Sequence, residues 1–186
     1  MRILIADDES IIRLGLKAML QEMGHEVIAA MNGREAIQMA GRQQPELAIL
    51  DIKMPYTDGL QAAKTICRQR PIPILILTAF SDSELIEKAT DLPIQGYLIK
   101  PIKAADLTAA ISVATKRFEE GQELAERAQQ LEESIKTRKL VERAKGKLML
   151  TGLSEEDAFL AVQIHARQNR QTMRDAARSI LGEKGP

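Results

Sequence analysis

The sequence contains no tryptophan, and aromatic residues make up only 3% of its 186 residues. Proteins that bind single-stranded nucleic acid often stack bases on aromatic side chains, and this chain has little material for such a platform. Its one cysteine, Cys67, excludes an intrachain disulfide and a cysteine-rich zinc site. The apolar run at the N-terminus is too short for a signal peptide or a membrane span. We therefore expect a cytoplasmic protein with no membrane partner.

Excess charge of either sign is also missing, because 26 Lys and Arg residues balance 26 Asp and Glu residues. Any binding to nucleic acid must then come from local segregation of charge along the chain. Apolar residues make up 45% of the sequence and charged residues 28%, which is typical of a soluble globular protein. The length favours one medium domain joined to a smaller one.

The first 117 residues or so alternate short apolar runs with amphipathic stretches. The apolar runs, typical of strands buried on both faces, cover residues 3–6, 26–30, 47–50, 74–77 and 96–99. The helical candidates cover residues 10–23, 33–43, 58–69, 82–90 and 104–117. Asn32, Asp58 and Ser81 are plausible N-caps for three of them. Five such β-α units predict an α/β fold with a doubly wound, five-stranded parallel sheet.

Polar residues follow four of these predicted strands. They are Asp7 with Asp8, Asp51, Thr78, and Lys100 with Pro101. Because ligands of such sheets bind at the carboxyl ends of the strands, we expect these groups to converge. Three carboxylates in one place repel one another unless a hard divalent cation lies among them, and oxygen ligands suit Mg²⁺. A metal-bound carboxylate can attack a phosphoryl group, whose developing charge the metal, Lys100 and Thr78 would neutralise.

These residues, with the run 51–59 and the run 97–101, resemble the receiver domain of bacterial response regulators. The likeness covers about the first 117 residues and implies a flavodoxin-like fold. It implies that Asp51 accepts the phosphoryl group, from a sensor histidine kinase as partner. Beyond taking up and slowly losing this group, no enzymatic activity is expected.

The same resemblance implies a role for each residue of the site. Mg²⁺ would be bound by Asp8, Asp51 and the backbone carbonyl of Lys53, with Asp7 acting through a water molecule. Thr78 and Tyr97 would form the switch pair, and Lys100 would hold the phosphoryl group. The peptide bond before Pro101 would be cis.

Beyond residue 104 the sequence shows no further strand pattern. Residues 119–133 carry six acids against Arg127, a net charge of −5, and residues 136–147 carry six bases against Glu142, a net charge of +5. This inversion indicates a solvated acidic stalk followed by a basic surface. The residues Leu124, Ala128, Leu131 and Ile135 follow the 4-3-4 spacing of a coiled-coil seam. We expect this seam to form a homodimer that phosphorylation promotes, with Gly121 loosening the join to the receiver.

The chain is therefore predicted to contain a receiver domain at 1–117, a helical or coiled-coil linker at 118–135 and a small three-helix output domain at 136–186. A polar connector at 167–171 precedes a last helix at about 171–181. The four-residue spacing of Arg170, Arg174 and Arg178 predicts that they lie on one face of this helix. Charge on the outer face of an amphipathic helix is also an ordinary source of solubility.

The run 137–149, with its Ala144-Lys145-Gly146 motif, and the run 152–159 resemble the ANTAR domain of transcription antiterminators. The likeness covers about residues 124–181 and implies binding to paired hairpins in leader RNA. Lys145 and Gly146 are positions of the motif. Contact candidates chosen from charge and helix face alone are Arg138, Lys139, Arg143, Arg170 and Arg174. A helical glycine at 146 costs about 1 kcal/mol relative to alanine, so we expect a close backbone approach or tight packing of a neighbouring helix there.

The leading interpretation is a phosphorylation-activated response regulator that acts as an RNA-binding transcription antiterminator. One alternative is a DNA-binding response regulator whose last helices form a helix-turn-helix, a motif that needs a turn of about 3–4 residues. A second alternative is an output module for dimerisation or protein interaction only, with its basic faces merely solvated.

Overall fold

The computed structural model describes residues 1–79 and 93–183. The chain divides into two compact units, Met1–Gln122 and Glu123–Pro186. The helix predicted at 82–90, with its cap Ser81, lies outside the described residues.

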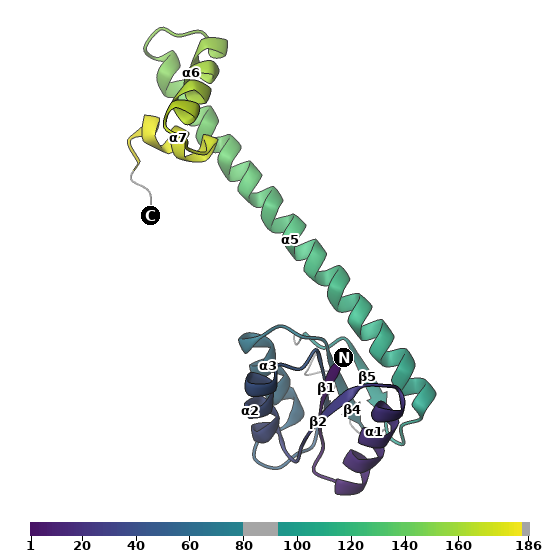
Figure 1. Ribbon diagram of the computed structural model, residues 1–186. Coiled ribbons are helices and arrows are strands. Elements are labelled where there is room, and N and C mark those ends of the chain that lie inside the picture. Colours follow the sequence, from purple (N-terminus) through teal and green to yellow (C-terminus); the bar gives the residue numbers. More distant parts are fainter. Residues whose placement is uncertain (80–92, 184–186) are drawn as a thin grey trace. The chain divides into compact units, whose positions relative to one another are not determined.

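The first unit contains a five-stranded parallel sheet with the strand order β2-β1-β3-β4-β5. The strands are β1 (Arg2–Ala6), β2 (Glu26–Ala30), β3 (Leu47–Asp51), β4 (Ile74–Thr78) and β5 (Gly96–Ile99). Every residue of β3 and β4 is buried, because helices cover both faces of the sheet (Figure 1). The predicted fold class is confirmed.

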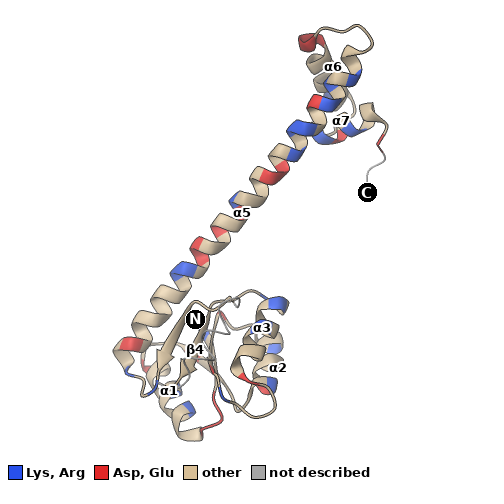
Figure 2. Cartoon of the chain, turned by 180° about the vertical axis from the view of Figure 1, so that it is seen from behind, with Lys and Arg blue, Asp and Glu red and all other residues tan. Residues whose placement is uncertain are grey.

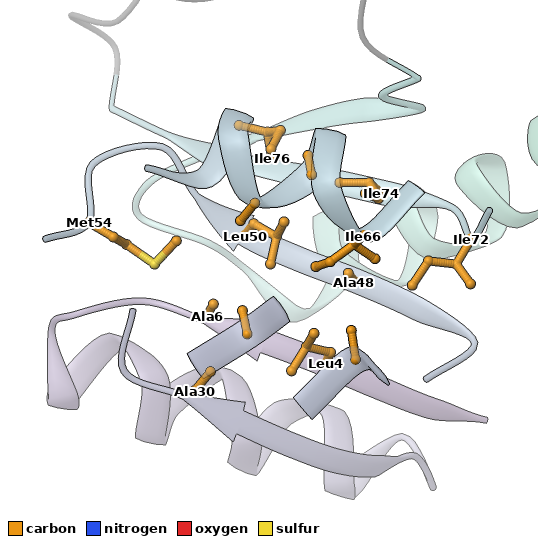
Figure 3. Close-up of a cluster of buried hydrophobic side chains, with 14 of the residues drawn as sticks. Leu4, Ala6, Ala30, Ala48, Leu50, Met54, Ile66, Ile72, Ile74 and Ile76 are labelled. Carbon is orange, nitrogen blue, oxygen red and sulfur yellow. The ribbon is translucent and has the colours of Figure 1, made fainter. Parts of the chain in front are cut away.

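Two hydrophobic clusters fill the two faces of this sheet. On one face, strand residues such as Leu4, Leu50 and Ile76 pack against α2 (Gly33–Gln43) and α3 (Gly59–Gln69) (Figure 3). On the other face the strands pack against α1 (Ser10–Glu22) and the first turns of α5 (Ala104–Met149). Two of the predicted caps are confirmed: the Asn32 side chain accepts from the amide of Glu35, and that of Asp58 accepts from the amide of Gln61.

Helix α5 is continuous over 46 residues and passes from the first unit into the second. The helix runs unbroken through Gly121, and the expectation that this glycine loosens the join to the receiver stays a prediction. A helical glycine costs only about 1 kcal/mol relative to alanine, and the neighbouring Glu, Gln, Ala and Leu residues are strong helix formers. No other part of the described chain comes within 4 Å of the position of a Cβ on Gly121.

The second unit packs the end of α5 against α6 (Glu155–Gln168) and α7 (Met173–Leu181). Its core consists of Val141, Ala144, Val162, Ala166, Ala176 and Ala177. The hydroxyl of Ser154 caps α6, and that of Thr172 caps α7. The three-helix output unit is confirmed. No described helix is long and apolar enough to cross a membrane.

The prediction that Arg170 lies on one face of the last helix with Arg174 and Arg178 is wrong. Helix α7 begins only after its cap Thr172, so Arg170 belongs to the turn between α6 and α7. Its backbone there has a φ of 51°, in the left-handed region. A four-residue spacing places side chains on one face only where the helix is unbroken.

Candidate functional site

Three carboxylates meet at the carboxyl edge of the sheet. Asp7 follows β1 directly, Asp8 comes next, and Asp51 ends β3. One oxygen from each carboxylate lies within 4.8 Å of the other two. Asp7 is fully buried and Asp51 is 6% exposed, whereas Asp8 is exposed. The strand ends thus bring together the three acids that the sequence singled out.

Lys100, which follows β5, joins two of these acids. Its Nζ lies 2.9 Å from Oδ2 of Asp7 and 2.9 Å from Oδ1 of Asp51. Burial lowers the pKa of Lys100, but its close interactions with the two carboxylates outweigh this effect and raise the pKa to about 12. The ammonium is therefore charged at neutral pH. Burial raises the pKa of Asp51, an effect that Lys100 partly offsets.

The β1–α1 loop is fixed by contacts that the sequence patterns did not reveal. Oδ1 of Asp7 accepts a hydrogen bond from the Glu9 amide at 2.8 Å, and the Glu9 carboxylate lies 3.6 Å from Nζ of Lys100. Nη1 of Arg13 donates to the backbone carbonyl of Asp7 at 2.8 Å. Arg13 therefore orders the loop through its backbone. The only hint of this contact in the sequence was the position of Arg13, a basic residue among apolar residues in the first turns of the predicted helix.

The β3–α3 loop closes tightly over Asp51. The amide of Gly59 donates to the carbonyl of Ile52 at 3.0 Å, and the amide of Ile52 donates to the carbonyl of Leu77 at 3.2 Å. A cleft of about 520 Å³ beside this loop is lined by Asp8, Ile52, Lys53, Met54, Pro55, Asp58 and Leu60. Lys53 lies in the loop that follows Asp51, and the role of its carbonyl as a metal ligand stays a prediction.

The predicted switch residues lie on the last two strands. Thr78 is 1% exposed, and its hydroxyl donates to the carbonyl of Ala79 at 3.0 Å. The amide of Lys100, the residue after β5, donates to the carbonyl of Thr78 at the end of β4 at 2.9 Å, so Thr78 and Lys100 lie side by side. Tyr97 is 36% exposed, and burial of the rest of its ring raises its pKa. The Lys100–Pro101 peptide bond is cis, as the resemblance implies.

The donor set fits a metal ion. Three carboxylates carry more negative charge than the single Lys100 ammonium neutralises. Oδ2 of buried Asp7 lies within ion-pair distance of Lys100, but it accepts no well-directed hydrogen bond from any described residue. Carboxylate oxygens at this spacing suit a hard divalent cation. The Asp7, Asp8 and Asp51 group could therefore hold a metal.

Basic residues gather on α5 close to α6 and α7, where Figure 2 shows blue Lys and Arg positions. Several of the predicted RNA contacts pair with acids instead. Nη2 of Arg143 lies 2.8 Å from Oε1 of Glu183, and Nη1 of Arg174 pairs with Oε2 of Glu133. These pairs connect α5 to α7 and to Glu183, two residues after the end of α7. Arg143 and Arg174 therefore contribute to packing, whatever else they bind.

Lys145 is the most buried of the basic candidates. It is 8% exposed, and its Nζ lies 2.8 Å from Oε1 of Glu155 and 3.1 Å from Oε2 of Glu142. These hydrogen bonds, with Glu155 contributing most, raise the pKa of Lys145. The ammonium thus has its counter-ions within the protein, which favours a structural role for Lys145 over a phosphate contact.

Arg138, Lys139 and Arg170 are exposed and form no ion pair with a described residue. They remain the basic candidates most accessible to a polyanion. Gly146 is also exposed, and no other part of the described chain lies within 4 Å of the position of a Cβ there. Tight packing of a neighbouring helix therefore does not explain this glycine, contrary to that expectation.

The predicted dimer seam forms an apolar stripe along α5. Leu124, Leu131 and Ile135 are 66%, 64% and 47% exposed, and Ala128 is exposed with them. Large apolar side chains this exposed, at heptad spacing on one helix, suit a partner helix.

A doubly wound sheet with an acid cluster and a lysine at its carboxyl edge defines a receiver-type domain. The family model of the response regulator receiver domain matches residues 3–112, and that of the ANTAR domain matches residues 129–181. The chain belongs to the response regulators, in the group that joins a receiver domain to an ANTAR domain. Both resemblances are confirmed.

Similar proteins agree with this assignment. The transcriptional regulatory protein PdtaR of Mycobacterium tuberculosis is 44% identical over 186 residues, covering 99% of this chain and 91% of that protein. The transcriptional regulatory protein LnrK of Bacillus subtilis is 36% identical over 113 residues, covering 59% of this chain and 51% of its own length. The solved receiver domain protein from Clostridium thermocellum has a TM-score of 0.59 and 31% identity, covering 63% of this chain and 96% of that one.

Proposed function

We propose that this chain is a phosphorylation-activated transcription antiterminator. A sensor histidine kinase phosphorylates Asp51, and the output unit then binds hairpin RNA in a nascent leader transcript. The observation that supports this most is the combination, in one chain, of a buried Asp51 beside the Lys100 ammonium and an ANTAR domain. PdtaR, which is similar along nearly the whole chain, carries the name of a transcriptional regulatory protein.

In the phosphorylation step, a carboxylate oxygen of Asp51 attacks the phosphorus atom of a phosphohistidine, and the P–N bond breaks as the imidazole leaves. Mg²⁺ held by Asp8, Asp51 and the carbonyl of Lys53, with Asp7 acting through a water molecule, would supply positive charge for the phosphoryl oxygens. Lys100, 2.9 Å from Oδ1 of Asp51, is positioned to hold one of these oxygens. Attack of water on the acyl phosphate later returns Asp51 to its free form.

The switch follows from the contacts of Thr78 and Tyr97. The Thr78 hydroxyl, which donates to the Ala79 carbonyl, would turn to donate to a phosphoryl oxygen. This rotation leaves room at the end of β4, into which the partly exposed Tyr97 ring moves. The surface that carries β5 and the start of α5 thereby changes shape.

The changed surface favours a homodimer through the seam of Leu124, Ala128, Leu131 and Ile135. Burial of one leucine side chain stabilises by roughly 1.5–3 kcal/mol. The stripe is too narrow to be the core of a domain, but two copies would complete it. A dimer presents two output units, as a pair of hairpins requires.

The output unit binds RNA through its basic surface. Arg138, Lys139 and Arg170 are exposed, and Arg143 and Arg174 could exchange their acidic partners for phosphates. Sequence is read in the hairpin loops, because the deep major groove of A-form RNA hides its base edges and loop bases remain accessible. The match to the ANTAR model favours RNA over DNA as the ligand.

The test uses the full chain and tandem-hairpin RNAs that wild type selects from a pool with randomised loops. Acetyl phosphate with Mg²⁺ is expected to phosphorylate wild type and to tighten its RNA binding, with weaker binding to a DNA duplex of equal length. Asp51→Asn is the matched control, and it should neither label nor gain affinity.

Tighter binding to DNA at both of two salt concentrations would support the helix-turn-helix alternative. No binding to either nucleic acid by a folded, dimeric protein would support the interaction-module alternative. Labelling of Asp51→Asn, or of wild type in excess chelator, would contradict the phosphorylation chemistry.

A further inference from the structure

The second unit contains a groove of about 690 Å³ beside its only aromatic side chain, Phe159. Phe159 is 41% exposed, although it is the largest apolar residue of α6. The groove lies between α5, α6 and α7. Its lining includes Ser134, Thr137, Arg138, Val141, Phe159 and Met173.

The groove combines an apolar floor with a polar rim. Val141 is 7% exposed and Met173 is partly buried, so these two side chains and the Phe159 ring present apolar surface. Ser134 and Thr137 add hydroxyl groups that can donate and accept hydrogen bonds. A nucleobase has the matching form, because its flat face stacks on aromatic and apolar side chains while its edge forms hydrogen bonds.

The acids of the groove are engaged by basic side chains of the same unit. Two acids, Glu133 and Glu142, line it, but both have basic partners. Oε2 of Glu142 lies 3.1 Å from Nζ of Lys145, and Glu133 pairs with Arg174 and, at 3.3 Å, with Lys136. The pKa of Glu133 is lowered, with the hydrogen bond from Lys136 as the largest cause, so its carboxylate stays ionised and paired.

Arg138 differs from these groups. It lines the groove and is exposed, and it forms no ion pair within the described chain. It is therefore the cation of the groove that is available to a phosphate.

Lys145 fixes the Phe159 ring. Its ammonium lies 6.0 Å from the ring centroid, at cation–π distance, and is held in place by Glu142 and Glu155. The ring thus has an anchored cation as a neighbour while part of it remains exposed. This gives Lys145 the role of a positioning residue, which acts on the ligand through Phe159.

We propose that this groove binds an unpaired nucleobase from an RNA hairpin loop, which stacks on Phe159 while Arg138 contacts a neighbouring phosphate. This inference rests on the proposed RNA-binding function and specifies which part of the RNA is recognised. Stacking of one base on an aromatic side chain changes affinity by about tenfold or more.

The absence of tryptophan from the chain allows a direct test in the full-length protein. Phe159→Trp introduces a single indole, whose fluorescence is quenched when a base stacks on it. Titration with the selected tandem-hairpin RNAs should quench it, and an abasic substitution at one loop position should abolish the quenching. The matched control is Leu160→Trp, because Leu160 is the next residue of α6 and is 52% exposed. This second indole should report little change on binding the same RNA.

Affinity supplies the second measurement. Phe159→Leu should weaken binding to the selected RNA about tenfold, whereas Leu160→Ala should leave it unchanged. The abasic substitution should weaken binding of wild type by a similar factor and have no further effect on Phe159→Leu. Circular dichroism and thermal melting show whether Phe159→Leu is folded, and the quenching of Phe159→Trp tests stacking independently of that variant.

Three results would overturn the inference. The first is RNA binding without quenching of Phe159→Trp, and the second is unchanged affinity of Phe159→Leu. The third is a phosphorylation-dependent change in the indole emission that needs no RNA, which would assign the groove to a second copy of the chain. In each case the RNA binding of wild type survives, so the proposed function would stand. Failure of wild type to select any RNA would refute both.

Discussion

A Cβ atom on Gly59 would lie 2.0 Å from the backbone carbonyl oxygen of Asp51. The start of α3 therefore packs directly against the backbone of Asp51, the proposed phosphoacceptor, in a space that no side chain can share. The amide of Gly59 also donates to the carbonyl of Ile52, which follows Asp51. The missing side chain at 59 is what allows the β3–α3 loop to close over the site.

We predict that Gly59→Ala destabilises the receiver by about 1–3 kcal/mol, the usual cost of overpacking, because backbone atoms must move to admit the methyl group. The shift displaces Asp51, so the rate of labelling by acetyl phosphate should fall about tenfold or more. Urea unfolding and labelling rates measure the two effects. Gly15→Ala is the matched control, because no atom outside the local backbone of α1 lies within 4 Å of its Cβ position. It should stabilise by up to about 1 kcal/mol. Equal behaviour of the two variants would contradict the steric argument.

The sequence was sufficient for the parallel sheet and for the acid cluster, because both follow from simple rules. Buried parallel strands are continuous apolar runs, and their carboxyl ends meet at one edge. Asp7, Asp51 and Lys100 could therefore be placed together before the structure was known. The role of Arg13 could not be predicted in this way. It donates to the backbone carbonyl of Asp7, and every residue has such a carbonyl, so the sequence does not indicate the contact.

Predictions on the output unit were weaker because they relied on charge. Spacing placed Arg170 on the last helix, but the helix begins later, after Thr172. Charge also made Arg143 and Arg174 contact candidates, whereas Glu183 and Glu133 pair with them within the unit. Pairing between helices depends on tertiary packing, which a linear count of charges does not contain.

Asp51→Asn is expected to change the pH dependence of stability in the presence of chelator. Burial raises the pKa of Asp51 above 3.8. An acid with a raised folded-state pKa contributes stability at pH below 3.8, and this contribution is lost as the pH rises through the folded-state pKa. The asparagine variant lacks this loss. Its free energy of unfolding should therefore exceed that of wild type by more at pH 7 than near pH 3.8.

Urea unfolding at a series of pH values measures this difference. The contribution of Lys100 is constant over this range, because its raised pKa of about 12 confines its loss to pH above about 10.5. If the difference in the free energy of unfolding between Asp51→Asn and wild type is the same at pH 3.8 and pH 7, ionisation of Asp51 carries no cost in the folded protein.

Leu131→Asp is expected to abolish the phosphorylation-dependent dimer. Leu131 is 64% exposed at the centre of the predicted seam. A symmetric dimer contains two copies of this residue, so the substitution removes two leucine side chains from the interface. At roughly 1.5 kcal/mol or more for each copy, dimer dissociation should increase at least a hundredfold. Sedimentation of the phosphorylated protein measures this. Gln129→Asp adds the same charge to an exposed position of α5 outside the seam and should leave the dimer intact. A dimer equally insensitive to both variants would place the interface elsewhere.

Arg138→Gln and Arg174→Gln should differ in a way that separates a phosphate contact from an internal ion pair. Arg138 is exposed and has no partner in the described chain, so its loss should weaken RNA binding and lessen the salt slope by about 1. Arg174 pairs with Glu133 across α5 and α7, and its loss should chiefly lower the melting temperature. Binding isotherms at several salt concentrations and thermal melts distinguish the two. An unchanged salt slope for Arg138→Gln would remove it from the interface.

Lys145→Gln provides the sharpest test of how the output unit uses its motif lysine. The ammonium is neutralised by Glu142 and Glu155 and lies over the Phe159 ring. Its removal should therefore weaken RNA binding without changing the salt slope, because no phosphate loses a counter-ion. The loss should not add to that of Phe159→Leu, since both changes act through the same ring. Lys145→Arg keeps the charge over the ring and should recover part of the affinity. A salt slope lowered by about 1, or full additivity with Phe159→Leu, would instead make Lys145 a direct phosphate contact.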